Sequence, residues 1–139
     1  MKSFLSPLLR DGSTPHVLEN VRTGAVVADH LLTAFDSASR RQGLLGRDSL
    51  PDGTALIIAP SNAVHTFFMR FSIDLAFVRR DGRVIKVRTA VGPRRLSAAL
   101  RAFAVVELAA GALSRSGTES GDTLICRPAA SPPDRSASS

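Results

Sequence analysis

The sequence lacks several features that would place it in a functional class. Its 139 residues contain no apolar run of the ~18 residues that a membrane-spanning helix requires, so we expect no membrane span. Its single cysteine, Cys126, excludes an internal disulfide. A chain of this length buries roughly two-thirds of the surface of its extended form, which is enough for a core without a structural metal.

Motifs of several enzyme and cofactor classes are also missing. The three histidines, His16, His30 and His65, are too dispersed for a metal-ligand spacing. The segment GTESG at 117–121 is not a nucleophile elbow, because its serine stands one position late. No glycine precedes the Lys-Ser/Thr pair of a phosphate-binding loop. We therefore predict no catalytic residues, no bound metal and no cofactor.

The charge balance is basic, with 18 Lys and Arg against 12 Asp and Glu and a net charge of +6. Such a balance favours anionic partners and leaves nucleic-acid binding open, but it does not indicate a fold. The first ten residues match an export signal only in part, because the apolar stretch is short, contains Pro7 and ends at Arg10. We expect a cytoplasmic protein.

Composition divides the chain into three parts. Residues 1–15 carry turn residues without a sustained hydrophobic period, so we expect a loose N-terminal leader. Residues 128–139 are small and polar and cannot offset the entropy of ordering them, so we expect a disordered tail. No repeat or linker interrupts residues 16–127, which we interpret as a single β-rich domain.

Most of this domain has the pattern of short strands separated by turn residues. Eight such segments favour a mainly β (α+β) fold, either a compact β-sandwich or a barrel, with one to three short helices. Asp36 as N-cap predicts a helix over 37–45 that ends at Gly46, and short helices are expected at 96–102 and 111–116. The predicted strands are 17–21, 25–34, 55–59, 64–71, 75–79, 84–89, 104–108 and 123–127.

The clearest local signal is the Asp81-Gly82 pair, which favours a two-residue hairpin turn of the primed type. Such a turn sets Val78 opposite Ile85 on a face that points inward. Asp74 has the same phase as Val78 and therefore leans toward the apolar side. A carboxylate there needs a partner, and hydrogen bonds from nearby backbone N–H groups are the leading interpretation, with an ion pair or protonation as alternatives.

The segment 64–71 holds the densest group of unusual side chains. As a strand it places His65, Phe67 and Met69 on one side and Arg70 on the other. This pattern has two interpretations, a ligand-binding slot that uses His65, or a core stripe in which His65 is hydrogen-bonded at the edge.

Two acidic residues interrupt or precede apolar strands. Glu107 lies inside 104–108, so we expect it on an exposed edge or in an ion pair, for which Arg47 and Arg70 are the candidates. Asp122 precedes 123–127, where stabilisation of a turn is the leading interpretation.

Several of these segments, taken in order, carry a resemblance to a known family. They are RQGLLGR at 41–47, HTFFMRFSID at 65–74, the hairpin at 77–82, ELAAG at 107–111 and Gly121-Asp122. Together they resemble the prokaryotic family called domain of unknown function 192. The resemblance implies a compact, mainly β domain and no reaction. It also implies a shared structural or ligand-binding site made of Arg47, His65, Met69, Arg70, Asp74, Glu107 and Asp122.

We therefore hypothesise a non-enzymatic binding module for a small polar or anionic ligand or a peptide, with a site formed by Arg47 and residues 65–74. One alternative is a hydrolase or lyase in which His65 is the base and Asp74 orients it. The other alternative is nucleic-acid binding across the basic face of the hairpin, formed by Arg79, Arg80, Arg83, Lys86 and Arg88.

Overall fold

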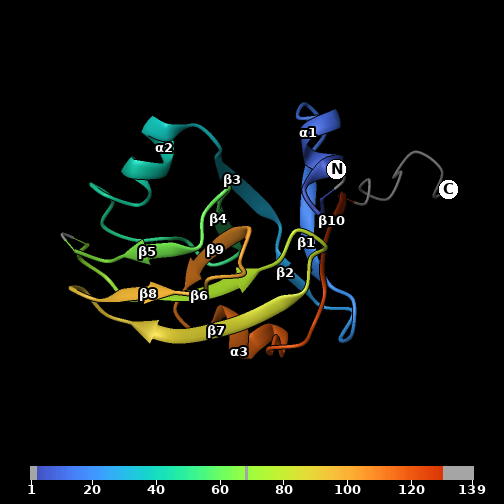
Figure 1. The fold of residues 1–139 in the computed structure, drawn as a ribbon. Coiled ribbons are helices and arrows are strands. Elements are labelled where there is room, and N and C mark those ends of the chain that lie inside the picture. The colour runs from blue at the N-terminus through green and yellow to red at the C-terminus, as the bar shows by residue number, and fades with distance from the viewer. Residues whose placement is uncertain (1–2, 68, 130–139) are drawn as a thin grey trace, which may run out of the picture.

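The computed structural model describes residues 3–67 and 69–129, which form ten strands and three short helices (Figure 1). The fold is mainly β, as predicted, and belongs to the α+β class. In chain order the elements are α1 (Ser6–Arg10), β1 (His16–Asn20), β2 (Val26–Ala28), β3 (His30–Ala34), α2 (Ser37–Gln42), β4 (Thr54–Ile58), β5 (Ala63–His65), β6 (Ile73–Val78), β7 (Val84–Val91), β8 (Leu96–Ala98), β9 (Ala104–Ala109), α3 (Ala112–Ser116) and β10 (Leu124–Pro128).

Three sheets build the fold. The central sheet has five strands in the order β3-β4-β9-β6-β7, in which β3 and β4 are parallel and the other neighbours antiparallel. A sheet of three strands, β10-β1-β2, and a ribbon of two strands, β5-β8, complete the set. The sheets form layers and do not close into a barrel, so of the two expected architectures the barrel is excluded.

The inner strands of the central sheet, β4, β9 and β6, are buried on both faces. On one face Ala76 and Val78 pack with Leu18 of β1 and Leu124 of β10. On the other face a second apolar cluster covers the sheet. Every residue of β4 and β6 is buried, which explains why both strands are apolar except for Thr54 and Asp74, because no position of either strand faces water. The second cluster includes Leu44, Leu50, Leu56, Ile58, Met69, Ile73, Leu75, Phe77 and Val105.

The predicted strand 64–71 is wrong beyond His65, where β5 ends. The reason is Thr66, which is buried and turns the chain. Its hydroxyl donates to the carbonyl of Gly92 at 2.7 Å and accepts from the backbone N–H of Arg95 at 2.9 Å. His65, Phe67 and Met69 therefore do not share one side of a strand. Phe67 is exposed, whereas Met69 is buried.

Three other predicted elements differ in extent or type. The helix expected at 96–102 is replaced at its start by strand β8, which pairs with β5. The expected strand 25–34 divides into β2 and β3, because Asp29 donates its backbone N–H to Gly53 and the chain passes from one sheet to another. Helix α2 ends at Gly43 rather than Gly46. The helix at 111–116 and the remaining strands are found within two residues of the predicted bounds.

The N-terminal segment packs on the domain, which corrects the expectation of a loose leader. Phe4 and Leu5 are 7% and 2% exposed, and the backbone N–H of Phe4 donates to the carbonyl of Arg80 at 2.9 Å. Burial of these two side chains stabilises the docked segment, by about 2 kcal/mol each. At the other end β10 includes Pro128, and residues 130–139 of the predicted tail lie outside the described residues.

The hairpin between β6 and β7 has a longer connection than predicted. Gly82 donates its N–H to the carbonyl of Arg79, and Arg79 donates its own to Arg83, which is the pattern of a three-residue loop ending in a bulge at Gly82. Val78 consequently pairs with Val84 and not with Ile85. Only away from the loop does the register follow from the predicted turn, with Leu75 opposite Arg88, Ala76 opposite Val87 and Phe77 opposite Lys86.

Replacement of Gly82 by alanine tests how tightly this loop is held. Gly82 has a φ of +94°, and a Cβ there would lie 2.3 Å from the carbonyl oxygen of Leu124. Gly121 is the matched control, because its φ is +98° but nothing lies within 4 Å of a Cβ. We expect Gly121→Ala to lose about 1 kcal/mol of unfolding free energy and Gly82→Ala about 2 kcal/mol. Urea titration followed by circular dichroism measures both, and equal losses would contradict the close contact.

Candidate functional site

A cavity of about 570 Å³ lies between α2, the loop that follows it, and β5. Helix α2 is fixed at its start by a capping box, in which the Asp36 carboxylate accepts from the backbone N–H of Ser39 at 2.8 Å. The same hydrogen bond holds the pKa of Asp36 below its ordinary value. The helix in turn presents Arg40 and Arg41 to the cavity.

Glu107 lines this cavity from the central sheet. It lies on β9 between two buried leucines of the neighbouring strands, Leu56 of β4 and Leu75 of β6. Its side chain is 5% exposed, and a Cβ at Gly43 would lie 3.9 Å from its Oε1 atom, so the loop after α2 covers the carboxylate. Burial raises the pKa of Glu107 to about 7.

The ion pair expected for Glu107 is not formed with any described residue. No hydrogen bond or salt bridge within 3–67 and 69–129 reaches its carboxylate. The exposed-edge alternative is also wrong, because β9 is the middle strand of the five-stranded sheet. An acid in such surroundings has a large desolvation cost that only a partner or a proton can offset.

Two other predicted site residues, His65 and Met69, line the same cavity. His65 ends β5 and its ring lies 5.6 Å from that of Phe67, centroid to centroid. Met69 is buried in the second apolar cluster, whereas Phe67 is 44% exposed. Of the seven residues that the family resemblance assigns to one shared site, His65, Met69 and Glu107 therefore line this cavity.

Asp74 faces the opposite side of the central sheet. It pairs with Leu108, the neighbour of Glu107 on β9, so the two acids point to different faces. Asp74 is fully buried and accepts three backbone N–H groups, from Ala90 at 2.9 Å, Gly111 at 3.1 Å and Leu113 at 3.0 Å. It thus fixes a bulge in β7 and the start of α3. It does not line the cavity that holds His65.

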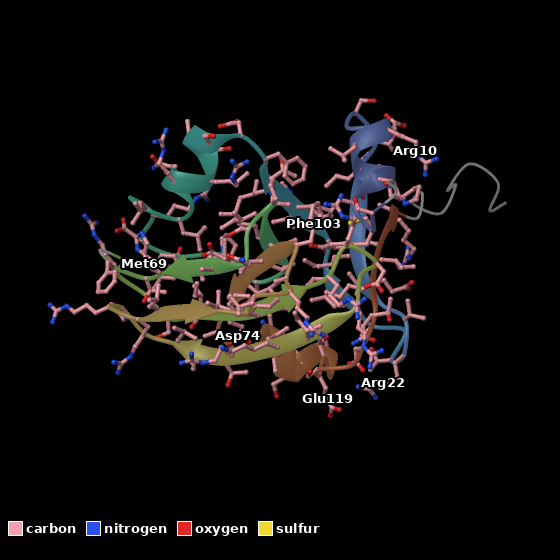
Figure 2. The ribbon with its side chains drawn as sticks, in the orientation of Figure 1. Arg10, Arg22, Met69, Asp74, Phe103 and Glu119 are labelled. Carbon is pink, nitrogen blue, oxygen red and sulfur yellow. The ribbon has the colours of Figure 1, made fainter. Side chains whose placement is uncertain are left out.

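Asp122 lies at a third place, beside α3 and the turn after β1. It accepts from Arg22 Nε at 2.6 Å, from Asn20 Nδ2 at 2.9 Å and from the backbone N–H of Glu119 at 2.8 Å. The hydrogen bond from Arg22 is the main cause of a pKa well below the ordinary range of an aspartate. The interpretation of Asp122 as a turn stabiliser is confirmed. In Figure 2, Arg22 and Glu119 lie at the end of the molecule away from Met69.

The two predicted site arginines lie outside the cavity lining. Arg70 forms an exposed ion pair with Asp48, with 2.7 Å between Nη1 and Oδ1. Arg47 is exposed in the loop after α2. Exposed pairs of this kind contribute little to stability, on the order of 0.5 kcal/mol.

Most of the basic hairpin face has partners within the chain. Lys86 donates to the carbonyl of Ala98 at 2.8 Å, and Arg88 donates to Ser97 Oγ at 2.9 Å. The guanidinium of Arg80 lies 4.2 Å from the centroid of the Phe103 ring. Arg79 lies within 3.8 Å of Asp81. These contacts give a structural reason for four of the five residues, so the face offers little support for the nucleic-acid alternative.

Sequence reasoning missed Arg40 and Arg41 as residues that line the cavity. The capping signal at Asp36 predicts their helix correctly, but a helix of six residues has no period long enough to indicate which face is covered. Within 3–67 and 69–129, no group of three or more His, Cys, Asp or Glu side chains is arranged to hold a metal ion. Likewise, none of the helices in these ranges has the length and apolar character to cross a bilayer.

Comparison with known proteins gives a family and a fold. The family profile of domain of unknown function 192, described as Uncharacterized ACR, matches residues 20–126. No curated protein matches. A crystal structure from Sinorhizobium meliloti 1021, described as a putative transcription regulator, is 21% identical and superimposes with a TM-score of 0.69 over 80% of this chain and 91% of that one. A protein of unknown function from Novosphingobium aromaticivorans DSM 12444 is 24% identical, with a TM-score of 0.68 over 79% and 82%.

Proposed function

The chain belongs to the family domain of unknown function 192, and we propose that it is a binding module that holds a small polar ligand in the cavity between α2 and β5. The observation that carries the proposal is Glu107, a residue only 5% exposed that lines this cavity and whose carboxylate forms no hydrogen bond or ion pair within 3–67 and 69–129. Ordinary proteins pair or neutralise such groups. A ligand that hydrogen-bonds to Glu107 would remove the cost of its burial.

The size and chemistry of the cavity support the same proposal. A volume of about 570 Å³ is in the range of small-molecule sites, which combine mostly apolar walls with a few polar groups. Leu44, Ile58 and Met69 supply apolar surface. Arg41 supplies an exposed guanidinium suited to an anionic group on the ligand.

A ligand screen by thermal unfolding tests the proposal. The chain has no Trp and no Tyr, so unfolding is followed with an extrinsic dye or by calorimetry. The screen uses small amines, carboxylates, amino acids and phosphate esters at millimolar concentration. A ligand present at about 100 times its Kd adds about 2.7 kcal/mol to the free energy of unfolding and raises Tm by several degrees. We expect at least one class to do so.

A pair of cavity variants shows whether a stabilising compound binds at this site. Ala63 and Ala98 are both exposed and face each other across β5 and β8, but only Ala63 lines the cavity. We expect Ala63→Phe to fill the entrance and weaken binding by about tenfold or more, and Ala98→Phe to bind as the wild type does. Stabilisation by no compound, or equal binding by the two variants, would reject the proposal.

A further inference from the structure

The cavity has opposite charges at its inner and outer parts. Glu107 forms the inner part, because it projects from the middle strand of the central sheet and is 5% exposed. Arg41 belongs to the outer part, because it lies on α2 and is exposed. A ligand that matches both groups has its hydrogen-bond donor at the buried end and its acceptor at the exposed end.

The cations of the protein itself do not neutralise Glu107. The charged or titratable side chains that line the cavity with it are Arg40, Arg41 and His65. Arg40 donates instead to the carbonyl of Phe35 at 2.6 Å and to Ser37 Oγ at 3.4 Å. Burial raises the pKa of Glu107, and none of the ion pairs within 3–67 and 69–129 includes its carboxylate. The carboxylate of Glu107 is therefore available to a cationic group of a ligand.

Part of the cavity wall is apolar. Leu44 and Ile58 are 2% and 3% exposed, and Met69 is 7% exposed. The side chain of Val64 is half-buried on the same cavity. Methylene groups of a ligand would pack against these side chains, and each one buried contributes about 0.8 kcal/mol.

We propose that the ligand is a small aliphatic zwitterion, whose ammonium group binds the Glu107 carboxylate and whose own carboxylate binds Arg41. The chemical class is that of the amino carboxylates. This inference rests on the proposed function, because it names the ligand class of the same cavity.

Binding of an ammonium group at Glu107 is coupled to the protonation of that residue. Because the pKa of Glu107 is raised to about 7, its carboxyl group is protonated in a large fraction of the protein molecules at neutral pH. An ammonium group binds the ionised form, so binding near neutral pH releases a proton from Glu107. Affinity for an amine should therefore rise as pH rises through about 7, with His65, Arg40 and Arg41 as the other groups that face the site.

Isothermal titration calorimetry with a series of simple probes tests the class. The series is glycine, β-alanine, γ-aminobutyrate and δ-aminovalerate, and each is compared with the alkylamine and the carboxylate of the same chain length. We expect one member to bind about tenfold or more tightly than either single-charge analogue. Titration in buffers of different ionisation enthalpy should show proton release for the amines and none for the carboxylates.

Matched variants assign each charge to its residue. Glu107→Gln should abolish the advantage conferred by the ammonium group and the proton release, with Glu119→Gln as the control, because Glu119 is exposed and outside the cavity. Arg41→Gln should abolish the advantage conferred by the carboxylate, with Arg10→Gln of α1 as the control. Circular dichroism establishes that each variant is folded.

The outcomes separate this inference from the proposal on which it rests. If simple carboxylates or phosphate bind as tightly as the amino carboxylates, and Ala63→Phe still blocks them, the cavity is a binding site but the zwitterion class is wrong. An amine advantage that survives in Glu107→Gln overturns the assignment of the ammonium to that residue. If no amino carboxylate binds but another compound of the thermal screen does, only the zwitterion class is wrong, whereas both proposals fail if neither experiment finds a ligand.

Discussion

The Asp74→Ala variant is expected to lose about 4 kcal/mol of its free energy of unfolding, because one buried and two partly buried backbone N–H groups then lose their acceptor. A loss of this size is a large part of the 5–15 kcal/mol that stabilises an ordinary domain, on the order of half. Urea unfolding followed by circular dichroism measures it.

Two comparison variants locate the cause of this loss. Asp74→Asn keeps one acceptor oxygen and should lose about half as much. Asp52→Ala removes an aspartate whose ion pair with Arg115 is exposed, and should change stability by less than about 0.5 kcal/mol. Amide hydrogen exchange should also accelerate in Asp74→Asn at Ala90, Gly111 and Leu113. Unchanged protection of these amides would show that Asp74 does not hold them.

The central part of the fold could be predicted because its signals are local. Strands β4, β6 and β9 are short apolar runs bounded by turn residues, and each lies between two apolar layers. Alternation along β6 predicts correctly that Asp74 points inward. It could not predict the partners of Asp74, which come from Ala90 and from the start of α3, because long-range contacts leave no local pattern.

The parts that were mispredicted depend on side-chain contacts between distant segments. Residues 66–71 have the composition of a strand, but the Thr66 hydroxyl binds Gly92 and Arg95 and turns the chain after β5. Residues 96–98 have no strand signal of their own, and they extend because β5 lies beside them. In both cases tertiary hydrogen bonds outweigh local preference.

The sequence predicts one shared site of seven residues, of which only His65, Met69 and Glu107 line the cavity. Glu107 was conspicuous because an acid interrupts an apolar strand, and His65 and Met69 because they are unusual in such a segment. The sequence also suggested Arg47 and Arg70 near Glu107, whereas the structure places Arg40 and Arg41 on its cavity. Which arginines reach this cavity depends on the direction of the short helix α2 relative to the sheet. A helix of six residues is too short for its hydrophobic period to indicate that direction.

The Glu107→Gln variant is expected to be more stable than the wild type at alkaline pH, by about 3 kcal/mol. The pKa of Glu107 is about 7 in the folded protein against 4.5 for the ordinary group. Between these values the folded chain keeps a proton that the unfolded chain has lost, so rising pH favours unfolding. The destabilisation is absent below about pH 4.5, grows up to about pH 7 and is constant above it.

Unfolding free energies of wild type and variant, measured by urea titration across this pH range, test the prediction. The two should differ little at about pH 4.5 and diverge as pH rises, because glutamine does not ionise. Glu119→Gln, at an exposed position, should follow the wild type throughout. A difference that stays constant with pH would contradict the raised pKa of Glu107.

The same measurement links stability to binding. Buried acids with a raised pKa are typical of functional sites. At such sites a residue is often kept for function although another residue would make the folded protein more stable. An amino carboxylate that pairs with Glu107 should therefore stabilise the wild type most at alkaline pH and narrow the gap to Glu107→Gln. If the gap stays equally wide when saturating ligand is present, the ligand does not neutralise Glu107, and its ammonium group binds elsewhere.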